Sequence, residues 1–450
     1  MKRRDLLWTV TATSFSFVVA QLDVTIVNVA LPSIAADLGA GVASLQWIVD
    51  GYTLAFAVLL LSAGVLGDRY GSKRAYQYGF LLFGAASAAC GLAPGAASLV
   101  VARAVQGAGA ALLVPNSLAL LNHATAHAPD VRARAVGQWT AAGAISIAAG
   151  PVLGSLLLTA FGWRSIFLVN LPLCAIGMWL AATHVPPAPK SATPRGLDLP
   201  GQIFAVLALT GLTGAVIEWR PLGASHPVVA GGALLAVVAG TAFVWTESRA
   251  RAPMLPLRFF RKPNFTAAVI FGVLVNFTYY GVIFVLSLYL QQALGYSVFH
   301  AGLAYLPLTG SFFVSNLLSG RVAARVGSRL PMTVGALVGA LGYFLLVRLD
   351  GASSYGAMLP AFMLIPAGMG FAVPAMTTVT LASVDREWSG TASAVLNAAR
   401  QAGAAMGVAL FGALAAGGPA HVIAGVGRAA LISTAMLVLG SAIAWTRIRA

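Results

Sequence analysis

The stretch Gly64-Val-Leu-Gly-Asp-Arg-Tyr-Gly-Ser-Lys-Arg74 decides the fold, because the chain repeats it as Gly320-Arg-Val-Ala-Ala-Arg-Val-Gly-Ser-Arg329. Each copy is a short, basic, glycine-containing turn between two long apolar segments. Such a repeat of a turn with its flanking helices is typical of proteins built from two similar helical bundles with a path between them. The second copy has Ala324 where the first has Asp68, so we expect two related but unequal halves.

The composition places the protein in a lipid bilayer. Of the 450 residues, 59% are apolar and 9% are charged, and the mean hydropathy is +0.86. A soluble domain carries roughly 25% charged residues, so this chain cannot cover a water-facing surface. The apolar segments reach the roughly 20 residues that a helix needs to cross a membrane, and no alternating strands of a membrane barrel are visible. We therefore predict an all-α integral membrane protein.

The apolar runs predict fourteen transmembrane helices. Their expected ranges are 6–31, 45–66, 76–93, 98–121, 135–160, 165–183, 199–218, 228–246, 265–290, 302–320, 330–349, 355–382, 390–416 and 424–446.

The loop charges predict the orientation. Basic residues gather in the loops on the side of the N-terminus, whereas those of the other side are Arg164, Arg220, Arg348 and Arg428. Cytoplasmic loops carry this excess, so we expect both termini in the cytoplasm and the protein in the cell (inner) membrane. The net charge of +15 then needs no nucleic-acid partner.

The distance between the two copies of the turn exceeds six spans, so two further spans must lie between the halves. We predict an N-terminal six-helix bundle at 1–184 and a C-terminal six-helix bundle at 263–450. Residues 185–262 then hold a linker rich in Pro, Ser, Thr and Ala and two additional transmembrane helices. We expect these two helices to pack at the periphery.

Four motifs, in the order of the spans, resemble those of one family. They are Leu22–Pro32 at the end of span one, Gly64–Arg74 between spans two and three, Arg103–Ala111 in span four and Gly143–Gly154 in span five. With these motifs the chain resembles the major facilitator superfamily and its fourteen-span drug:proton antiporter branch. Within that branch it is most similar to methylenomycin-resistance and quaternary-ammonium efflux proteins.

The resemblance implies a proton-coupled antiporter, not an enzyme, that exports lipophilic, often cationic, drugs or antibiotics by alternating access. Its partners would be the drug, protons and membrane lipid, and it would act as a monomer. The sequence contains no nucleotide-binding loop and no metal-ligand spacing, so we expect no cofactor and no metal. The alternatives are a proton-coupled symporter for a small metabolite and, from another class, a membrane-embedded enzyme or receptor.

Ionisable residues within apolar spans are the candidates for proton coupling or substrate binding, because a charge at membrane depth is costly unless it is paired, neutralised or wetted. They are Asp23, Arg103, Glu218 and Asp50, and the polar, uncharged Gln106 joins them because it follows Arg103 by one turn. Asp23 and Arg103 could instead fix helix packing, Glu218 could pair with Arg220, and Asp50 could be an exposed acid near a helix start. Arg400 also lies inside a span, and the sequence offers it no neighbouring acid.

The candidates for gating lie in the first basic turn and on span five. They are Gly64, Asp68, Arg69, Gly71, Arg74, Gly143, Gly150, Pro151 and Gly154. The charged residues could switch a network on the cytoplasmic side, and a smooth helix broken at proline could open the seam between the bundles. Solvated loop charges and ordinary small-residue packing are the respective alternatives.

Overall fold

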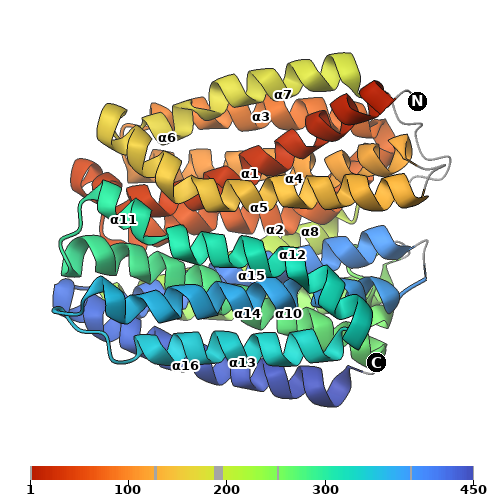
Figure 1. Ribbon diagram of the computed structural model, residues 1–450. Coiled ribbons are helices and arrows are strands. Elements are labelled where there is room, and N and C mark those ends of the chain that lie inside the picture. Colours follow the sequence, from red (N-terminus) through yellow and green to blue (C-terminus); the bar gives the residue numbers. More distant parts are fainter. Residues whose placement is uncertain (1–2, 126–128, 187–195, 251–252, 386–387, 449–450) are drawn as a thin grey trace.

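The computed structural model describes the whole chain except residues 1–2, 126–128, 187–195, 251–252, 386–387 and 449–450. The described residues form helices and no strands, which confirms the predicted fold class (Figure 1). The elements are α1 (Arg3–Leu38), α2 (Val42–Tyr70), α3 (Ser72–Gly91), α4 (Ala96–Ala124), α5 (Pro129–Phe161), α6 (Ser165–Leu168), α7 (Asn170–His184), α8 (Leu199–Leu222), α9 (Pro227–Arg249), η1 (Leu257–Arg261), α10 (Pro263–Leu288), η2 (Tyr289–Ala293), α11 (Val298–Ala304), α12 (Leu306–Val326), α13 (Arg329–Leu346), α14 (Tyr355–Ala382), α15 (Ser389–Ala415) and α16 (Pro419–Arg447).

These elements agree with fourteen spans. Three spans are each built from two consecutive elements, namely α6 with α7, α10 with η2, and α11 with α12. Within the described residues, 12 helices are long and apolar enough to cross a membrane, and α3 and α5 complete the set. In lipid each backbone group must be satisfied within its own segment, and a helix achieves this. The protein is therefore a multi-pass membrane protein.

The long helices run side by side, and both chain termini lie at the same end of the molecule (Figure 1). We call this end the terminal face and the other end the opposite face. α1 therefore begins at the terminal face, and α2 begins at the opposite face. Several spans have proline in their first turn, where a missing N–H costs nothing.

The two halves pack alike. In the first half α1 packs on α5, α2 on α4, and α3 on α4. In the second half α10 packs on α15, α12 on α14, and α13 on α14. The halves meet where α2 packs on α15 and where α5 packs on α11 and α12. These two contacts are also related by the repeat, so the internal symmetry extends to the seam between the bundles.

The repeated turn is shorter than predicted. α2 continues to Tyr70 and α3 begins at Ser72, so Gly71 alone forms the corner, with φ at 100°. In the second copy Gly327, with φ at 74°, follows the end of α12 in the same way. Both glycines occupy backbone conformations that other residues rarely adopt. Most of the motif predicted as a turn is helical, because the residues on either side of Gly71 continue α2 and begin α3.

α8 and α9 lie outside the repeat. α8 packs on α9, α2 and α15, whereas α9 packs mainly on α8. α9 exposes a row of large apolar side chains, among them Leu234, Val237 and Trp245. Because lipid is the solvent here, such a face needs no further protein cover.

Glycines bring α15 close to α10. A methyl group on Gly407 would collide with the backbone carbonyl oxygen of Phe277, and one on Gly403 would lie 2.6 Å from that of Val273. α5 packs on α1 through the related residues Gly150 and Gly154. Such close approach is typical of helix packing in membranes.

We expect Gly407→Ala to lower the stability of the protein by about 1–3 kcal/mol, because backbone atoms of α10 must move away from the new methyl group. The measurement is the midpoint of thermal unfolding of purified protein in detergent. Gly310→Ala is the matched control, since its new methyl group would meet nothing within 4 Å. Equal midpoints for the two variants would contradict the close packing of α15 on α10.

Candidate functional site

A fully buried polar cluster lies inside the N-terminal half. It joins Asp23 of α1, Ser87 of α3, Arg103 and Gln106 of α4, and Asn170 of α7, each no more than 1% exposed. Arg103 forms an ion pair and a hydrogen bond with the Asp23 carboxylate. Four helices therefore contribute to one network, at a depth where water is excluded.

The amides complete the coordination of Asp23. Gln106 Nε2 donates to Asp23 Oδ1 at 2.8 Å, and Asn170 Nδ2 donates to the same oxygen at 3.0 Å. Gln106 Nε2 also donates to Ser87 Oγ at 2.7 Å. An ionic partner and several hydrogen-bond donors offset the cost of burying a carboxylate. In this conformation the network is therefore a nearly complete set of charge-assisted hydrogen bonds.

The remaining contacts fix the Arg103 guanidinium. Its Nε donates to the Ile48 carbonyl oxygen at 3.2 Å, and a terminal nitrogen donates to Gln106 Oε1 at 2.6 Å. The Tyr52 ring lies 4.4 Å from the guanidinium carbon, within range of a cation–π interaction. Because Ile48 and Tyr52 belong to α2, these contacts tie α2 to the network as well.

Asp50 is a second buried acid, and the interpretation of an exposed acid at a helix start is wrong. α2 begins at Val42, earlier than predicted, so Asp50 lies two turns inside the helix and is 0% exposed. Neither of its carboxylate oxygens has a hydrogen-bond partner in the described part of the chain. A bare carboxylate in such a place would cost several kcal/mol, so the site suits the neutral acid.

Glu218 contacts α2, and the alternative of a pair with Arg220 is wrong. Trp47 Nε1 donates to Glu218 Oε1 at 3.3 Å, which ties α8 to α2. The Arg220 guanidinium instead lies 5.9 Å from the centre of the Trp219 ring. The pairing with Arg220 fails because α8 continues to Leu222, which places residues two apart on different faces of the helix.

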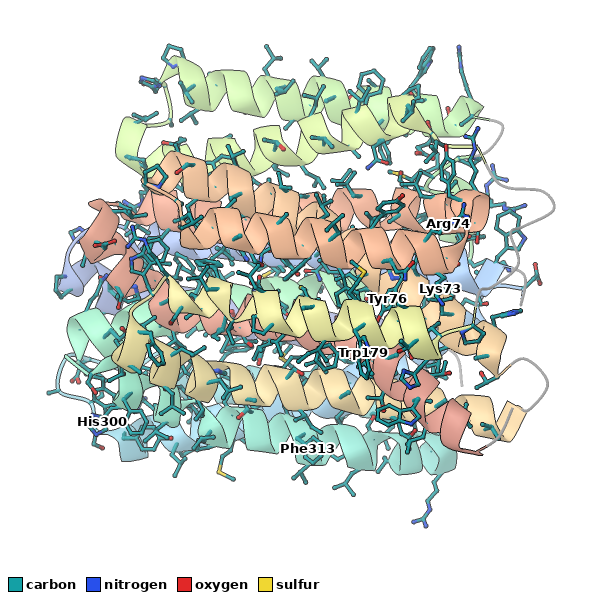
Figure 2. All side chains as sticks on the ribbon, turned by 90° about the horizontal axis from the view of Figure 1, so that it is seen from above. Lys73, Arg74, Tyr76, Trp179, His300 and Phe313 are labelled. Atoms are coloured by element: carbon teal, nitrogen blue, oxygen red, sulfur yellow. The ribbon has the colours of Figure 1, made fainter. Side chains whose placement is uncertain are left out.

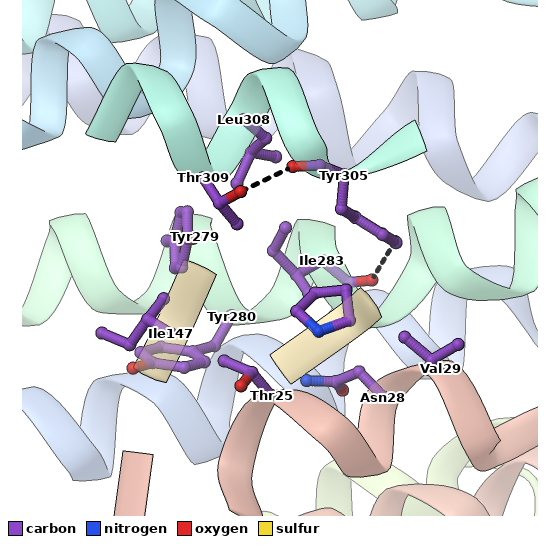
Figure 3. Close-up of a pocket in the computed structure, with 11 residues that line it drawn as sticks. Thr25, Asn28, Val29, Ile147, Tyr279, Tyr280, Ile283, Tyr305, Leu308 and Thr309 are labelled. Atoms are coloured by element: carbon purple, nitrogen blue, oxygen red, sulfur yellow. Dashed lines mark hydrogen bonds between the residues drawn. The ribbon is translucent and has the colours of Figure 1, made fainter. Parts of the chain in front are cut away.

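A narrow pocket with a free volume of about 20 Å³, room for roughly one water molecule, lies between the two halves (Figure 3). Side chains of α1, α5, α10 and the α11–α12 span surround it, and most of the lining surface is apolar. The lining residues are Thr25, Asn28, Val29, Ile147, Pro151, Tyr279, Tyr280, Ile283, Tyr305, Leu308 and Thr309. An apolar pocket with a few hydroxyl and amide groups suits a lipophilic ligand.

The halves are joined on the opposite-face side of this pocket. Gln46 Nε2 of α2 donates to the carbonyl oxygens of Val408 and Ala409 of α15, at 3.1 and 2.5 Å. Ser287 donates to the Asn28 carbonyl oxygen, and Gln291 donates at 3.1 Å to a carbonyl of α1. These residues lie in the halves of their helices nearest the opposite face, where they hold the two bundles together.

The glycines of α5 do not face this seam, so that part of the gating interpretation needs correction. Methyl groups on Gly143, Gly150 and Gly154 would run into Phe17, Thr25 and Ile26 of α1, within the same half. Small residues indicate a close helix neighbour, but not which one. Pro151 does lie at the seam, because it lines the pocket and a methyl group on Gly302 of α11 would lie 2.7 Å from its carbonyl oxygen.

The charged residues of the first repeat lie at the terminal face. Asp68, Arg69 and Arg74 are exposed there, and Gly64 lies within α2, where an added methyl group would meet no atom within 4 Å. Lys73 donates to the Ala182 carbonyl oxygen at 3.0 Å. Figure 2 shows Lys73 and Arg74 near one end of the molecule and His300 at the other, with Trp179 and Phe313 between them. The gating role of the repeat stays a prediction.

Sequence reasoning missed several contributors to these sites. Asn170 and Ser87 complete the Asp23 network, and Gln46 forms the contact between α2 and α15. The only signal was a single polar residue within an apolar span. That signal is weak, because such residues also bond to carbonyls of their own helix, as Asn276 does.

Comparisons with known proteins point to one family. The family model described as Major Facilitator Superfamily matches residues 13–408. The Methylenomycin A resistance protein of Streptomyces coelicolor is 40% identical over 403 residues, which cover 90% of this chain and 84% of that protein. The Multidrug resistance protein Stp of Mycobacterium tuberculosis is 37% identical over 416 residues, which cover 92% of this chain and 77% of that protein.

Solved structures show the same fold at low sequence identity. A bacterial homolog of the human lysosomal transporter Spinster, in an inward-facing and unoccupied conformation, matches with a TM-score of 0.70 at 18% identity. The match covers 99% of this chain and 97% of that chain. A D-xylose-proton symporter matches with a TM-score of 0.71 at 15% identity over 98% of each chain.

We expect Asp23→Asn and Arg103→Gln each to destabilise the protein by about 3–5 kcal/mol, because each leaves one buried charge without its counter-charge. The double variant should recover part of that loss. The measurement is a double-mutant cycle on thermal unfolding in detergent.

The pair Asp37 and Arg164 is the matched control, since its side chains are 48% and 41% exposed. The double-mutant cycle for this exposed pair should give an interaction free energy below about 1 kcal/mol. A coupling as small for Asp23 with Arg103 would refute the view that their network holds α1 to α4.

Proposed function

Because the chain belongs to the major facilitator superfamily, we propose that it is a transporter that exports lipophilic drugs or antibiotics in exchange for protons. The names of its relatives support the substrate class, since they include resistance to methylenomycin A and multidrug resistance. The narrow pocket between the halves is lined mostly by apolar groups, which suits such molecules once the halves part and the pocket widens. Alternating access then needs the halves to part on one side of the pocket and close on the other.

We infer the orientation from charge. Basic residues at the terminal face include Arg69, Lys73, Arg74, Lys262 and Arg447, so this face would lie in the cytoplasm of a cell with the protein in its inner membrane. The bundles would be 1–184 and 263–450, with 185–262 as the linker and extra helices. The joined opposite face would then be the outer side, and the structure would be closed to the outside.

The observation that carries the antiport proposal is that the Asp50 carboxylate has no hydrogen-bond partner among the described residues. Asp50 follows Gln46 by one helical turn, so it lies on the same side of α2, toward α15. Trp47, one turn before it on the adjoining side, contacts α8. Asp50 therefore lies where α2, α8 and α15 meet, just below the contact that closes the outer side.

This position couples closure to protonation. An ionised Asp50 would oppose the closed contact of α2 with α15, because burial of an unpartnered carboxylate is unfavourable. A proton taken up from outside, after the drug has left, removes the charge and permits closure. The proton stays bound to Asp50 while the protein changes to the inward-facing state. It is released to the inside before or during binding of the next drug molecule. The cycle exchanges one proton for drug without ATP.

The other candidate residues take supporting roles in this proposal. Asp23, Arg103 and Gln106 form the fixed polar core that holds α1 against α4, so the N-terminal bundle moves as a unit. Asp68, Arg69 and Arg74 lie where the cytoplasmic ends of the bundles would meet in the outward-facing state. Glu218 anchors α8 beside Asp50 through Trp47.

The general test is a panel of lipophilic antibiotics in a host that lacks its own efflux pumps. We expect the protein to raise resistance to some of them and a protonophore to abolish efflux of those compounds. Efflux that continues after the proton gradient has collapsed, while ATP is maintained, would refute proton coupling.

Asp50→Asn should bind drug but fail to couple its transport to protons, because asparagine keeps the shape of the side chain and cannot titrate. We expect drug-driven proton release from purified protein, followed with a pH-sensitive dye, to fall to background. Drug exchange across liposomes without a gradient should continue.

Asp37→Asn is the control, because Asp37 is a half-exposed acid at the outer end of α1 and should leave proton release unchanged. Normal drug-driven proton release by Asp50→Asn would show that another group carries the proton.

A further inference from the structure

Arg400 is a partly buried cation that the proposed mechanism does not use. It lies near the middle of α15, and its side chain passes Gly272 of α10. One terminal nitrogen donates to Asn397 Oδ1 of its own helix at 3.4 Å, which is a weak hydrogen bond. The buried Nε has no hydrogen-bond partner within the described residues. A guanidinium with open donors at membrane depth calls for an anion.

No acid of the described chain fills that need. From residue 263 onward the sequence contains three acids, Asp350, Asp385 and Glu387, and they lie in the segments that join α13 to α14 and α14 to α15. In the first half, Asp23 is held by Arg103 and two amides. The C-terminal bundle thus carries a positive charge inside its spans with no negative charge to match it.

Arg400 lies beside the drug pocket. Arg400 interacts electrostatically with Tyr280 of α10, which lines the pocket (Figure 3). Gly272, the neighbour of the Arg400 stem, precedes Tyr280 by two helical turns toward the terminal face. A molecule that enters from the terminal face therefore meets Arg400 before it reaches Tyr279, Tyr280 and the apolar wall of the pocket.

We propose that Arg400 binds the carboxylate of a lipophilic anion, so that the preferred substrates are amphiphilic carboxylic acids and not cations. This inference rests on the proposed function and specifies its substrate class. The planar guanidinium can bind a carboxylate with two parallel hydrogen bonds, and the Tyr280 hydroxyl can donate a third. The apolar body would then lie between Ile147, Ile283 and Leu308, after the halves have parted enough to widen the pocket.

A cation would find no comparable partner. Among the described acids near the seam, Asp50 is closed off beneath the contact of α2 with α15, and Glu218 accepts from Trp47 at the α8 side. The pocket lining itself contains hydroxyl, amide and apolar groups but, among the described residues, no carboxylate. Arg400 would repel a cation that approached from the terminal face.

The test uses three fluorescent probes with one apolar body and different head groups: 1-pyrenebutyrate, its neutral amide, and a pyrenebutyl trimethylammonium. Equilibrium binding is measured on the purified full chain in phosphatidylcholine nanodiscs, without a proton gradient. The variants are Arg400→Gln and Arg400→Lys, and Arg428→Gln, an exposed arginine of α16, is the control.

Wild type and the control should bind the carboxylate roughly 10- to 100-fold more tightly than the amide, the range expected for a charge-assisted hydrogen bond. Arg400→Gln should lose that preference and keep its affinity for the amide, which also shows that it is folded. Arg400→Lys should keep part of the preference, because a point charge replaces the planar fork.

Tighter binding of the ammonium probe, or equal loss of all three probes in a folded Arg400→Gln, would overturn the proposal. Nanodiscs with added phosphatidylglycerol test whether Arg400 binds the carboxylate of a substrate or the phosphate of a lipid headgroup. If that lipid abolishes carboxylate binding to wild type, Arg400 binds a headgroup and the proposal fails. Binding is measured without transport, so the two proposals can fail separately. If the protein prefers the carboxylate probe but its efflux continues in the presence of a protonophore, only the antiport mechanism is refuted.

Discussion

The protein depends on one constraint: a charge within the hydrocarbon layer must be paired, neutralised or wetted. The buried ionisable groups in and near the seam meet it differently. Asp23 and Arg103 are paired and hydrogen-bonded, and they bind four helices together. Asp50 has no partner among the described residues, so its environment suits the neutral acid. Arg400 keeps donors open beside the pocket. In our proposal, rigidity, proton coupling and substrate selection follow from these three arrangements.

The sequence predicted the spans well and the sites in part. Long apolar runs marked every span, and most helices begin a few residues before the predicted start. That extension moved Asp50 from an exposed helix start to a buried turn. The network of Asp23, Arg103 and Gln106 was foreseeable as costly charges in neighbouring spans. The partners of Gly150 and Gly154 were not, because a small residue reveals that a helix is near without revealing which helix it is.

The two halves share their packing and differ in their chemistry. α1 meets α5 as α10 meets α15, with glycines at both contacts. The core of the first half contains the Asp23 network, whereas the spans of the second half contain no acid and contribute Tyr279, Tyr280 and Arg400 near the seam. A duplicated scaffold can diverge in this way because the packing face and the seam face of each helix carry different residues. In our proposal the first half handles the proton and the second half recognises the drug.

The one-residue corner at Gly71 restricts how the N-terminal bundle can deform. To slide α2 past α3 by one turn would take about 5.4 Å, whereas a single residue spans at most about 3.6 Å. The corner has no slack for such shear, whereas Gly327 and Ser328 together leave more between α12 and α13. The motion that the corner still permits is rotation of α2 and α3 about Gly71, so the two helices move as one rigid pair. A small change where α2 meets α15 at one end must then reappear as a displacement at the other, across the full thickness of the membrane.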